Sequence, residues 1–161
     1  MCIRDSCNAV HKGRKVVCIG TDLRSDDRAG LEVCRNLDKL HPQLQTIICE
    51  YGIENCMHDI VSSQERSLVL IDAVIVPNLA PGTIVIVNRD EIGTQIPLTT
   101  HTIPVSLCLK LLENELGNLD VEVLGIVVQN LEIGLELSPE VKKSIELLIK
   151  AFSTCLASKK K

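Results

Sequence analysis

The sequence has almost no aromatic residues: its 161 residues include one Phe, one Tyr and no Trp. The core must therefore be aliphatic, and there is no set of aromatic rings on which single-stranded nucleic acid could stack. Positive charge is not in excess either, because 17 Lys and Arg stand against 21 Asp and Glu, which gives a formal net charge of -4. We therefore expect no nucleic-acid partner, since such partners are held mainly by Lys and Arg at their phosphates.

Long apolar runs are also missing. No stretch is long enough to cross a bilayer, and the first residues lack the apolar core of a secretory signal. The eight cysteines show neither Cys-x-x-Cys nor zinc-finger spacing, and most lie in apolar surroundings where thiols pack as small hydrophobic groups. These features predict a cytoplasmic protein in a reducing compartment, without a membrane partner.

Several common catalytic motifs are absent. Gly20 has no companion glycines of a dinucleotide-binding loop, and there is no Gly-x-x-x-x-Gly-Lys for a nucleoside triphosphate. No Gly-x-Ser-x-Gly elbow of a serine hydrolase is present. A cysteine nucleophile stays open, although Cys18 lies in an apolar run that reads as a buried strand, where thiols are usually inert.

The length and the 45% hydrophobic content predict one domain with one continuous core, here residues 14–157. Residues 1–13 are polar and without periodicity, so we expect a disordered leader. Residues 1–12 also resemble translated adapter sequence, and a non-native origin of this leader is a hypothesis. Residues 158–161 form a basic tail.

Short apolar runs alternate with stretches of helical spacing along the chain. This alternation predicts an α/β fold, a three-layer α/β/α domain with a mostly parallel sheet of about five strands. Strands are expected at 15–21, 44–50, 67–76, 83–88 and 121–128, and helices at 25–40, 54–63, 104–116 and 138–156. The run 67–76 is apolar on both faces, as in a central strand, whereas 83–88 is expected to be an antiparallel edge strand. Ser25 is the expected N-cap of the first helix.

Three polar residues are placed where such a sheet binds its ligands, at the carboxyl ends of the strands. Asp27 opens the helix after the first strand, Asp72 interrupts the apolar run 67–76, and His101 precedes the helix at 104–116. A carboxylate inside an apolar strand is costly to bury without a partner or a metal. Together, two carboxylates and an imidazole suit a divalent ion such as nickel, zinc or manganese.

Each of these residues also has a structural interpretation. A lone acid such as Asp72 more often caps a loop amide. Asp26 and Asp27 alone would more often compensate the helix dipole. His101 alone would more often be a hydrogen-bonded loop residue. The convergence of the three is inferred from topology alone.

An ordered series of motifs resembles the hydrogenase maturation protease family, particularly its hydrogenase 3 type. The series covers about residues 16–150, in the family's order and spacing. It comprises the first loop at 18–30, Ile71-Asp72-Ala73-Val74, Pro81-Gly82-Thr83, Thr99-Thr100-His101 with Pro104, and the stretches 125–126 and 134–141.

The resemblance implies that Asp27, Asp72 and His101 occupy the metal-contacting positions of the family. These side chains would meet nickel already inserted in the substrate, the precursor of a nickel-iron hydrogenase large subunit, and no organic cofactor is implied. The implied activity is that of an endopeptidase that removes the C-terminal extension of this precursor. We expect the protein to be a monomer. The catalytic residues would be Asp27 and Asp72, one of which activates water as a general base. The family is often classed as aspartic-type, but the sequence contains no Asp-Thr-Gly or Asp-Ser-Gly motif of a paired-aspartate enzyme.

The sequence departs from the family pattern in loops that would hold the substrate. Thr21 replaces Asn, Arg28 replaces Gly, residues 50–52 replace Asp-Gly-Gly, and residues 127–128 replace Gln-Pro. Two other functions stay open beside the peptidase. One is a non-catalytic chaperone that inspects nickel in the precursor, and the other is a small-molecule metallohydrolase that carries its own ion.

Overall fold

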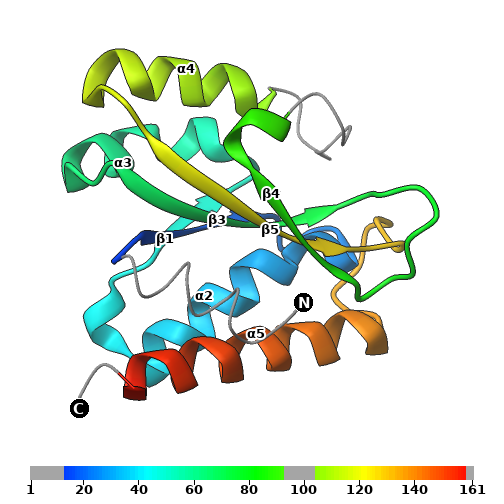
Figure 1. Ribbon diagram of the computed structural model, residues 1–161. Helices are drawn as coiled ribbons and strands as arrows, with labels where there is room; N and C mark the ends of the chain where they lie inside the picture. The colour runs from blue at the N-terminus through cyan, green and yellow to red at the C-terminus, as the bar shows by residue number, and fades with distance from the viewer. Residues whose placement is uncertain (1–12, 93–103, 159–161) are drawn as a thin grey trace.

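The computed structural model describes residues 13–92 and 104–158, which form a central sheet with helices on both faces (Figure 1). The strands are β1 (Lys15–Gly20), β2 (Ile47–Glu50), β3 (Ser67–Val74), β4 (Ile84–Asn88) and β5 (Asp120–Val127). The α-helices are α2 (Ala29–Leu40), α3 (Met57–Ser63), α4 (Val105–Leu116) and α5 (Pro139–Ser158). Short 3-10 turns are η1 (Ser25–Arg28), η2 (Pro42–Leu44), η3 (Ile53–Cys56) and η4 (Arg89–Glu91).

The sheet has the strand order β2-β1-β3-β5-β4, so β3 is central. Pairs β1–β2, β1–β3 and β3–β5 are parallel, and only β4, at the edge, runs antiparallel to its neighbour β5. The predicted fold class, the central position of the run 67–76 and the antiparallel edge strand are confirmed. The parallel strands end at a common edge, where the candidate site was expected.

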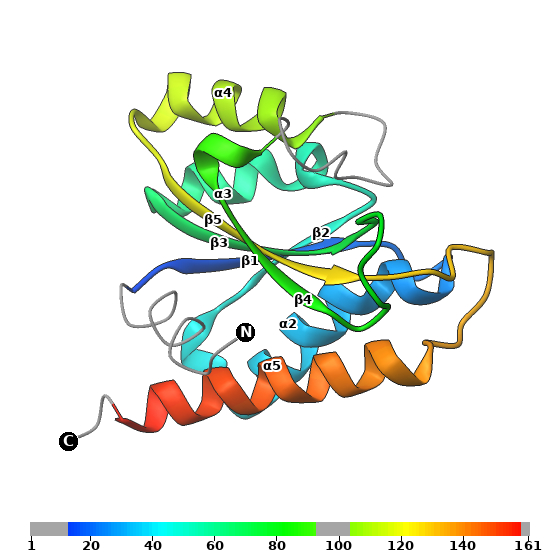
Figure 2. The same cartoon turned by 45° about the vertical axis from the view of Figure 1, so that its right-hand side comes forward.

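Helices α2 and α5 cover one face of the sheet and α3 and α4 cover the other (Figures 1 and 2). Strand β3 serves both layers because its side chains alternate between the faces. Val69, Ile71 and Ala73 belong to the apolar cluster that includes α2 and α5, and Leu68 and Leu70 belong to the cluster on the α4 side. This two-sided burial is the reason that the strand is apolar in almost every position.

The first helix begins later than its sequence pattern predicts. Residues Ser25–Arg28 form the 3-10 turn η1 and α2 starts at Ala29, so the predicted N-cap role of Ser25 is wrong. Ser25 instead takes a φ of 25°, and its N–H donates to the Gly134 carbonyl oxygen at 2.9 Å. Hydrogen bonds to a segment more than 100 residues away thus replace the local capping that the sequence suggested.

Gly30 lets α2 approach the backbone of the sheet closely. A Cβ atom at this position would lie 2.4 Å from the carbonyl oxygen of Ile19 in β1 and 2.6 Å from that of Ile71 in β3. Only a glycine fits between the helix and these two strands. The start of α2, and η1 before it, are thereby held against the carboxyl ends of β1 and β3.

Two disulfides are described, Cys18–Cys34 between β1 and α2, and Cys49–Cys56 between β2 and η3, and Cys155 is disulfide-bonded as well. The expectation that the cysteines pack as free thiols is wrong for these five. The paired cysteines are 16 and 7 residues apart, so no Cys-x-x-Cys pattern indicated these disulfides in the sequence. Cys108 is a free cysteine, and burial raises the pKa of its thiol.

Within residues 13–92 and 104–158, no helix is both long and apolar enough to cross a membrane. Apart from Gly13 and Ser158, the predicted leader and the predicted basic tail lie outside the described residues.

Candidate functional site

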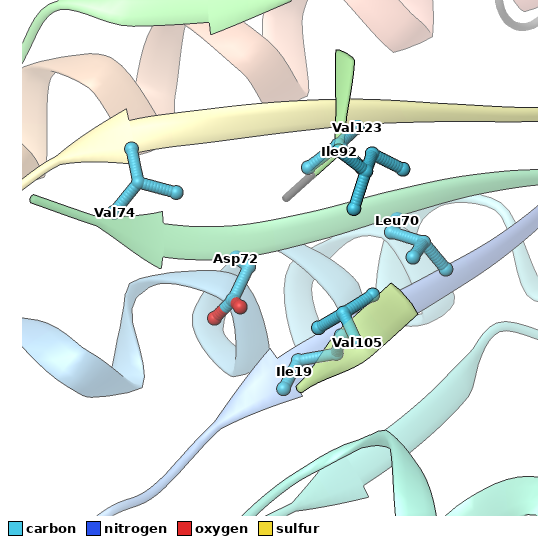
Figure 3. Close-up of a pocket in the computed structure, with 7 residues that line it drawn as sticks. All are labelled: Ile19, Leu70, Asp72, Val74, Ile92, Val105 and Val123. Atoms are coloured by element: carbon cyan, nitrogen blue, oxygen red, sulfur yellow. The ribbon is translucent and has the colours of Figure 1, made fainter. Parts of the chain in front are cut away.

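Asp72 lies in an aliphatic pocket near the carboxyl end of β3. Its side chain is only 3% exposed, and its Oδ1 accepts a hydrogen bond from the Ala73 N–H at 2.8 Å. The other described residues that line the pocket are all aliphatic, namely Ile19, Leu70, Val74, Ile92, Val105 and Val123 (Figure 3). Removing a carboxylate from water costs free energy that its partners must offset, so a buried acid at the end of a central strand is a candidate for a functional residue.

Asp27 is the second buried carboxylate at this edge, with 2% exposure. It belongs to η1, which contacts both β1 and β3. Its N–H donates to the Arg24 carbonyl oxygen at 2.7 Å, and its own carbonyl oxygen accepts from the Thr21 N–H at 3.3 Å. A Cβ at Gly20 would lie 2.2 Å from this oxygen, so the turn sits directly on the end of β1.

The structure therefore places two of the three predicted site residues on elements that touch at the carboxyl edge of the sheet. The third, His101, lies outside the described residues, as does the rest of 93–103. Among residues 13–92 and 104–158, no three His, Cys, Asp or Glu side chains are grouped as metal ligands would be. The roles of Asp27, Asp72 and His101 stay predictions.

Asp26 has a role that the sequence did not reveal. Its side chain is 0% exposed and accepts hydrogen bonds from the Asn130 N–H (3.2 Å), the Ser138 N–H (2.7 Å) and the Ser138 hydroxyl (2.7 Å). Ser138 directly precedes α5, so this carboxylate is placed at the start of α5, where a helix favours negative charge. From the sequence, Asp26 was expected to compensate the dipole of the helix that directly follows it. The start of α5 at Ser138-Pro139 could also be recognised in the sequence, but no local pattern linked it to Asp26.

Two arginines tie the same loop to its surroundings. Arg35 of α2 forms a two-point ion pair with Asp22, with N–O distances of 2.7 and 2.6 Å. Hydrogen bonding from Arg35 and its positive charge lower the pKa of the Asp22 carboxyl group. Arg28, which stands where the resembled family has Gly, donates to the Leu135 carbonyl oxygen at 2.7 Å and to Glu32 at 3.1 Å.

Exposed aliphatic side chains lie beside the loop that carries Asp27. Ile133 is 88% exposed, Leu135 is 71% exposed and Leu23 is 55% exposed. Gly134, between the first two, donates its N–H to the Leu23 carbonyl oxygen at 3.1 Å and forms a parallel bridge with Arg24. We call Leu23, Ile133 and Leu135 the apolar ledge.

The fold is that of a small α/β domain, and the two buried carboxylates lie at the carboxyl ends of its parallel strands, where such sheets bind ligands. Residues 39–154 match the sequence model of the family described as hydrogenase maturation protease (HycI), and the chain belongs to this family. It is therefore a maturation endopeptidase, and the family resemblance seen in the sequence is confirmed. The matched range contains Asp72 and His101 and begins after Asp27.

Solved structures of similar fold include several proteins of this kind. The [NiFe] hydrogenase maturation protease HybD from Thermococcus kodakarensis is 25% identical, with a TM-score of 0.70 over 86% of this chain and 95% of that chain. HycI from Thermococcus kodakarensis KOD1 is 22% identical, with a TM-score of 0.74 over 88% and 90%. The endopeptidase HycI from Escherichia coli is 24% identical, with a TM-score of 0.68 over 84% and 85%. A comparison with curated protein sequences gave no match.

Proposed function

We propose that this endopeptidase removes the C-terminal extension of a nickel-iron hydrogenase large-subunit precursor after nickel has been inserted. The observation that carries the proposal is the buried Asp72 carboxylate in its aliphatic pocket near the end of β3. Asp27 supports it, because η1 lies against the ends of β1 and β3. Family membership supplies the class of reaction.

In the proposed mechanism, nickel enters as part of the substrate and is contacted by Asp27, Asp72 and His101. Carboxylate oxygens and an imidazole nitrogen are ligands that nickel accepts. One of the two carboxylates, Asp27 or Asp72, takes a proton from the water molecule that attacks the scissile carbonyl carbon. The carbon–nitrogen bond then breaks, and this proton passes to the leaving amine. An Asp that acts as the general base agrees with the aspartic-type class of peptidases, although the sequence has no paired-aspartate motif.

The apolar ledge favours a polypeptide substrate over a small polar molecule. Exposed aliphatic groups gathered beside a site commonly mark a surface that another macromolecule covers. The ledge is hydrogen-bonded through Gly134 to the segment that leads into η1. A precursor docked on it would be close to Asp27. We further propose that the protein acts in the cytoplasm and binds the precursor as a monomer.

The proposal is tested by incubating the purified chain with nickel-loaded precursor and weighing the products. Two fragments, the shortened subunit and its tail, are the expected result. A stable complex without fragments would instead identify the nickel-inspecting chaperone. A chain that purifies with one tightly held ion per molecule and leaves the precursor intact would identify the metallohydrolase.

A further inference from the structure

We infer that Asp26 is a positioning residue that fixes Asp27 in the site by binding the turn η1 to the segment 130–138 before α5. The inference rests on the proposed role of Asp27. Asp26 does not touch the substrate in this proposal. Its carboxylate is fully buried and already engaged by three protein donors, two of them on Ser138.

The two segments are also joined by two backbone hydrogen bonds next to this carboxylate. The Asp26 N–H donates to the Asn130 carbonyl oxygen at 3.0 Å, and the Ser25 N–H donates to that of Gly134 at 2.9 Å. Figure 2 shows the loop between β5 and α5 beside the start of α2. The turn that carries Asp27 is thus held mainly by residues more than 100 positions away.

Local structure alone does not explain the conformation of this turn. The residue at the N-cap position of η1, Arg24, makes no side-chain cap hydrogen bond, and Ser25 has a left-handed φ of 25°. A non-glycine residue keeps such a conformation only where its surroundings impose it. The Asp26 carboxylate supplies one of these restraints, through the three hydrogen bonds that it accepts from Asn130 and Ser138.

A loss of this restraint would move Asp27 rather than remove it. Catalysis depends on reacting groups held within a fraction of an ångström, and small displacements caused by distant changes lower the rate by about 100-fold in some enzymes. Substrate binding on the apolar ledge would be affected less, because the backbone bonds that join Gly134 to Leu23 and Ser25 do not involve the Asp26 carboxylate. The expected signature is a lower kcat at nearly constant KM.

Ser138→Ala is the informative variant, because it deletes one hydroxyl and leaves every carboxylate in place. We expect its kcat for nickel-loaded precursor to fall about tenfold or more with KM changed by less than about twofold. Ser138→Thr keeps the hydroxyl and should restore kcat to within about threefold. Asp26→Asn should lower kcat further.

Ser144→Ala is the matched control. Ser144 lies in α5, just after Ser138 along the chain, and it is buried, whereas Ser138 is half-buried. Its hydroxyl donates to the carbonyl oxygens of Gly82 and Glu140 instead of to η1. It should lose comparable stability and keep its kcat at temperatures well below its melting point. An equal fall of kcat in both alanine variants would overturn the positioning role.

Amide hydrogen exchange provides a readout that needs no cleavage. The N–H groups of Ser25, Asp26 and Asp27 are all hydrogen-bonded, and their protection should fall about tenfold in Ser138→Ala and not in Ser144→Ala. Unchanged protection would overturn the inference, and so would lower protection with an unchanged kcat. If the wild-type chain cuts no loaded precursor, the proposed function fails, and the exchange data alone then decide whether Asp26 holds the turn.

Discussion

The side chain of Asp72 is almost fully buried, and the other described residues that line its pocket are aliphatic. Replacing it by Asn keeps the shape and removes the charge. We expect Asp72→Asn to lower the rate of precursor cleavage by about 100-fold or more, while the melting temperature stays equal or rises. His101→Ala, at the third predicted contact, should also abolish cleavage.

Asp59→Asn serves as the control for this change, because Asp59 is an exposed acid on α3. Its cleavage rate and melting temperature should match those of the wild type. A wild-type rate in Asp72→Asn would show that this carboxylate does no chemistry.

Asp22 gives a prediction for the dependence of stability on pH. Its pKa is lowered in the folded state, chiefly by the hydrogen bonds from Arg35. The pair therefore stabilises the fold at pH values above about 4, the usual pKa of an Asp, and this contribution is lost as the pH falls through the lowered pKa. Because both side chains are about one-third exposed, solvent screening limits the effect to about 0.5 kcal/mol.

Denaturant unfolding of the wild type and Asp22→Asn measures this contribution. The difference in unfolding free energy should be present at pH 7 and shrink at about pH 3. In an Arg35→Gln background, the pH-dependent effect of Asp22→Asn should be much smaller, because Arg35 is the largest cause of the lowered pKa. A difference that grows on acidification would contradict the assigned cause.

At the scale of single residues, the sequence predicted which polar residues are buried better than it predicted their hydrogen-bond or disulfide partners. Asp72 could be identified because it is a charged residue within an apolar run, and this pattern is visible without knowledge of the fold. Asp26 could not, because its partners Asn130 and Ser138 lie more than 100 residues away. Nor could the disulfide Cys18–Cys34, since strand and helix periodicity set neither pairing nor distance.

At the scale of elements, the strands and helices with regular apolar spacing were predictable, and the irregular turns were not. The predicted helix at 25–40 divides into η1 and α2, and that at 54–63 divides into η3 and α3. In the first of these, tertiary hydrogen bonds to the segment 130–138 outweigh local helix preference. The irregular turn is also where Asp27 lies, so the part of the site hardest to predict is the part shaped by distant contacts.

The segment before α5 makes a prediction of its own. If the apolar ledge docks the precursor, the double change Ile133→Ser and Leu135→Ser should raise KM about tenfold or more, because each aliphatic side chain buried in a complex contributes free energy. The kcat should change little. The bond from Arg28 to the Leu135 carbonyl oxygen involves the backbone and survives the substitution.

Leu147→Ser is the matched control, as Leu147 is an exposed leucine in α5, outside the ledge. Steady-state cleavage of nickel-loaded precursor by the three proteins separates the outcomes. An unchanged KM in the double variant would remove the ledge from the docking surface, and so would an equal rise in the control.

At the scale of the whole molecule, the two-sided apolar pattern of β3 specifies the three-layer architecture. Val69 and Ile71 need a helical layer on one face, and Leu68 and Leu70 need one on the other. The two described disulfides reinforce the layers, since Cys18–Cys34 lies within the α2 and α5 side and Cys49–Cys56 lies within the α3 and α4 side. Disulfides persist in oxidising surroundings, and a cytoplasmic location stays a prediction.

The last prediction concerns the enzyme together with its substrate. We expect cleavage to depend on nickel in the precursor and not on an ion held by the enzyme. Asp27, Asp72 and His101 would supply three contacts, which leaves coordination positions open. Such a set holds a free ion weakly, yet it completes the coordination of an ion that another protein presents. Nickel in the precursor then strengthens its binding to the enzyme. The enzyme can prefer the nickel-loaded precursor over the nickel-free one only by the free energy of its contacts with the ion.

The measurement begins with enzyme treated with chelator and then freed of it, offered nickel-loaded and nickel-free precursor side by side. Only the loaded precursor should be cut, at the rate given by untreated enzyme, because the ion arrives with the substrate. Equal processing of the nickel-free form would rule out nickel as the signal. Enzyme that stays inactive towards loaded precursor until zinc or nickel is returned to it would instead show that the ion belongs to the enzyme.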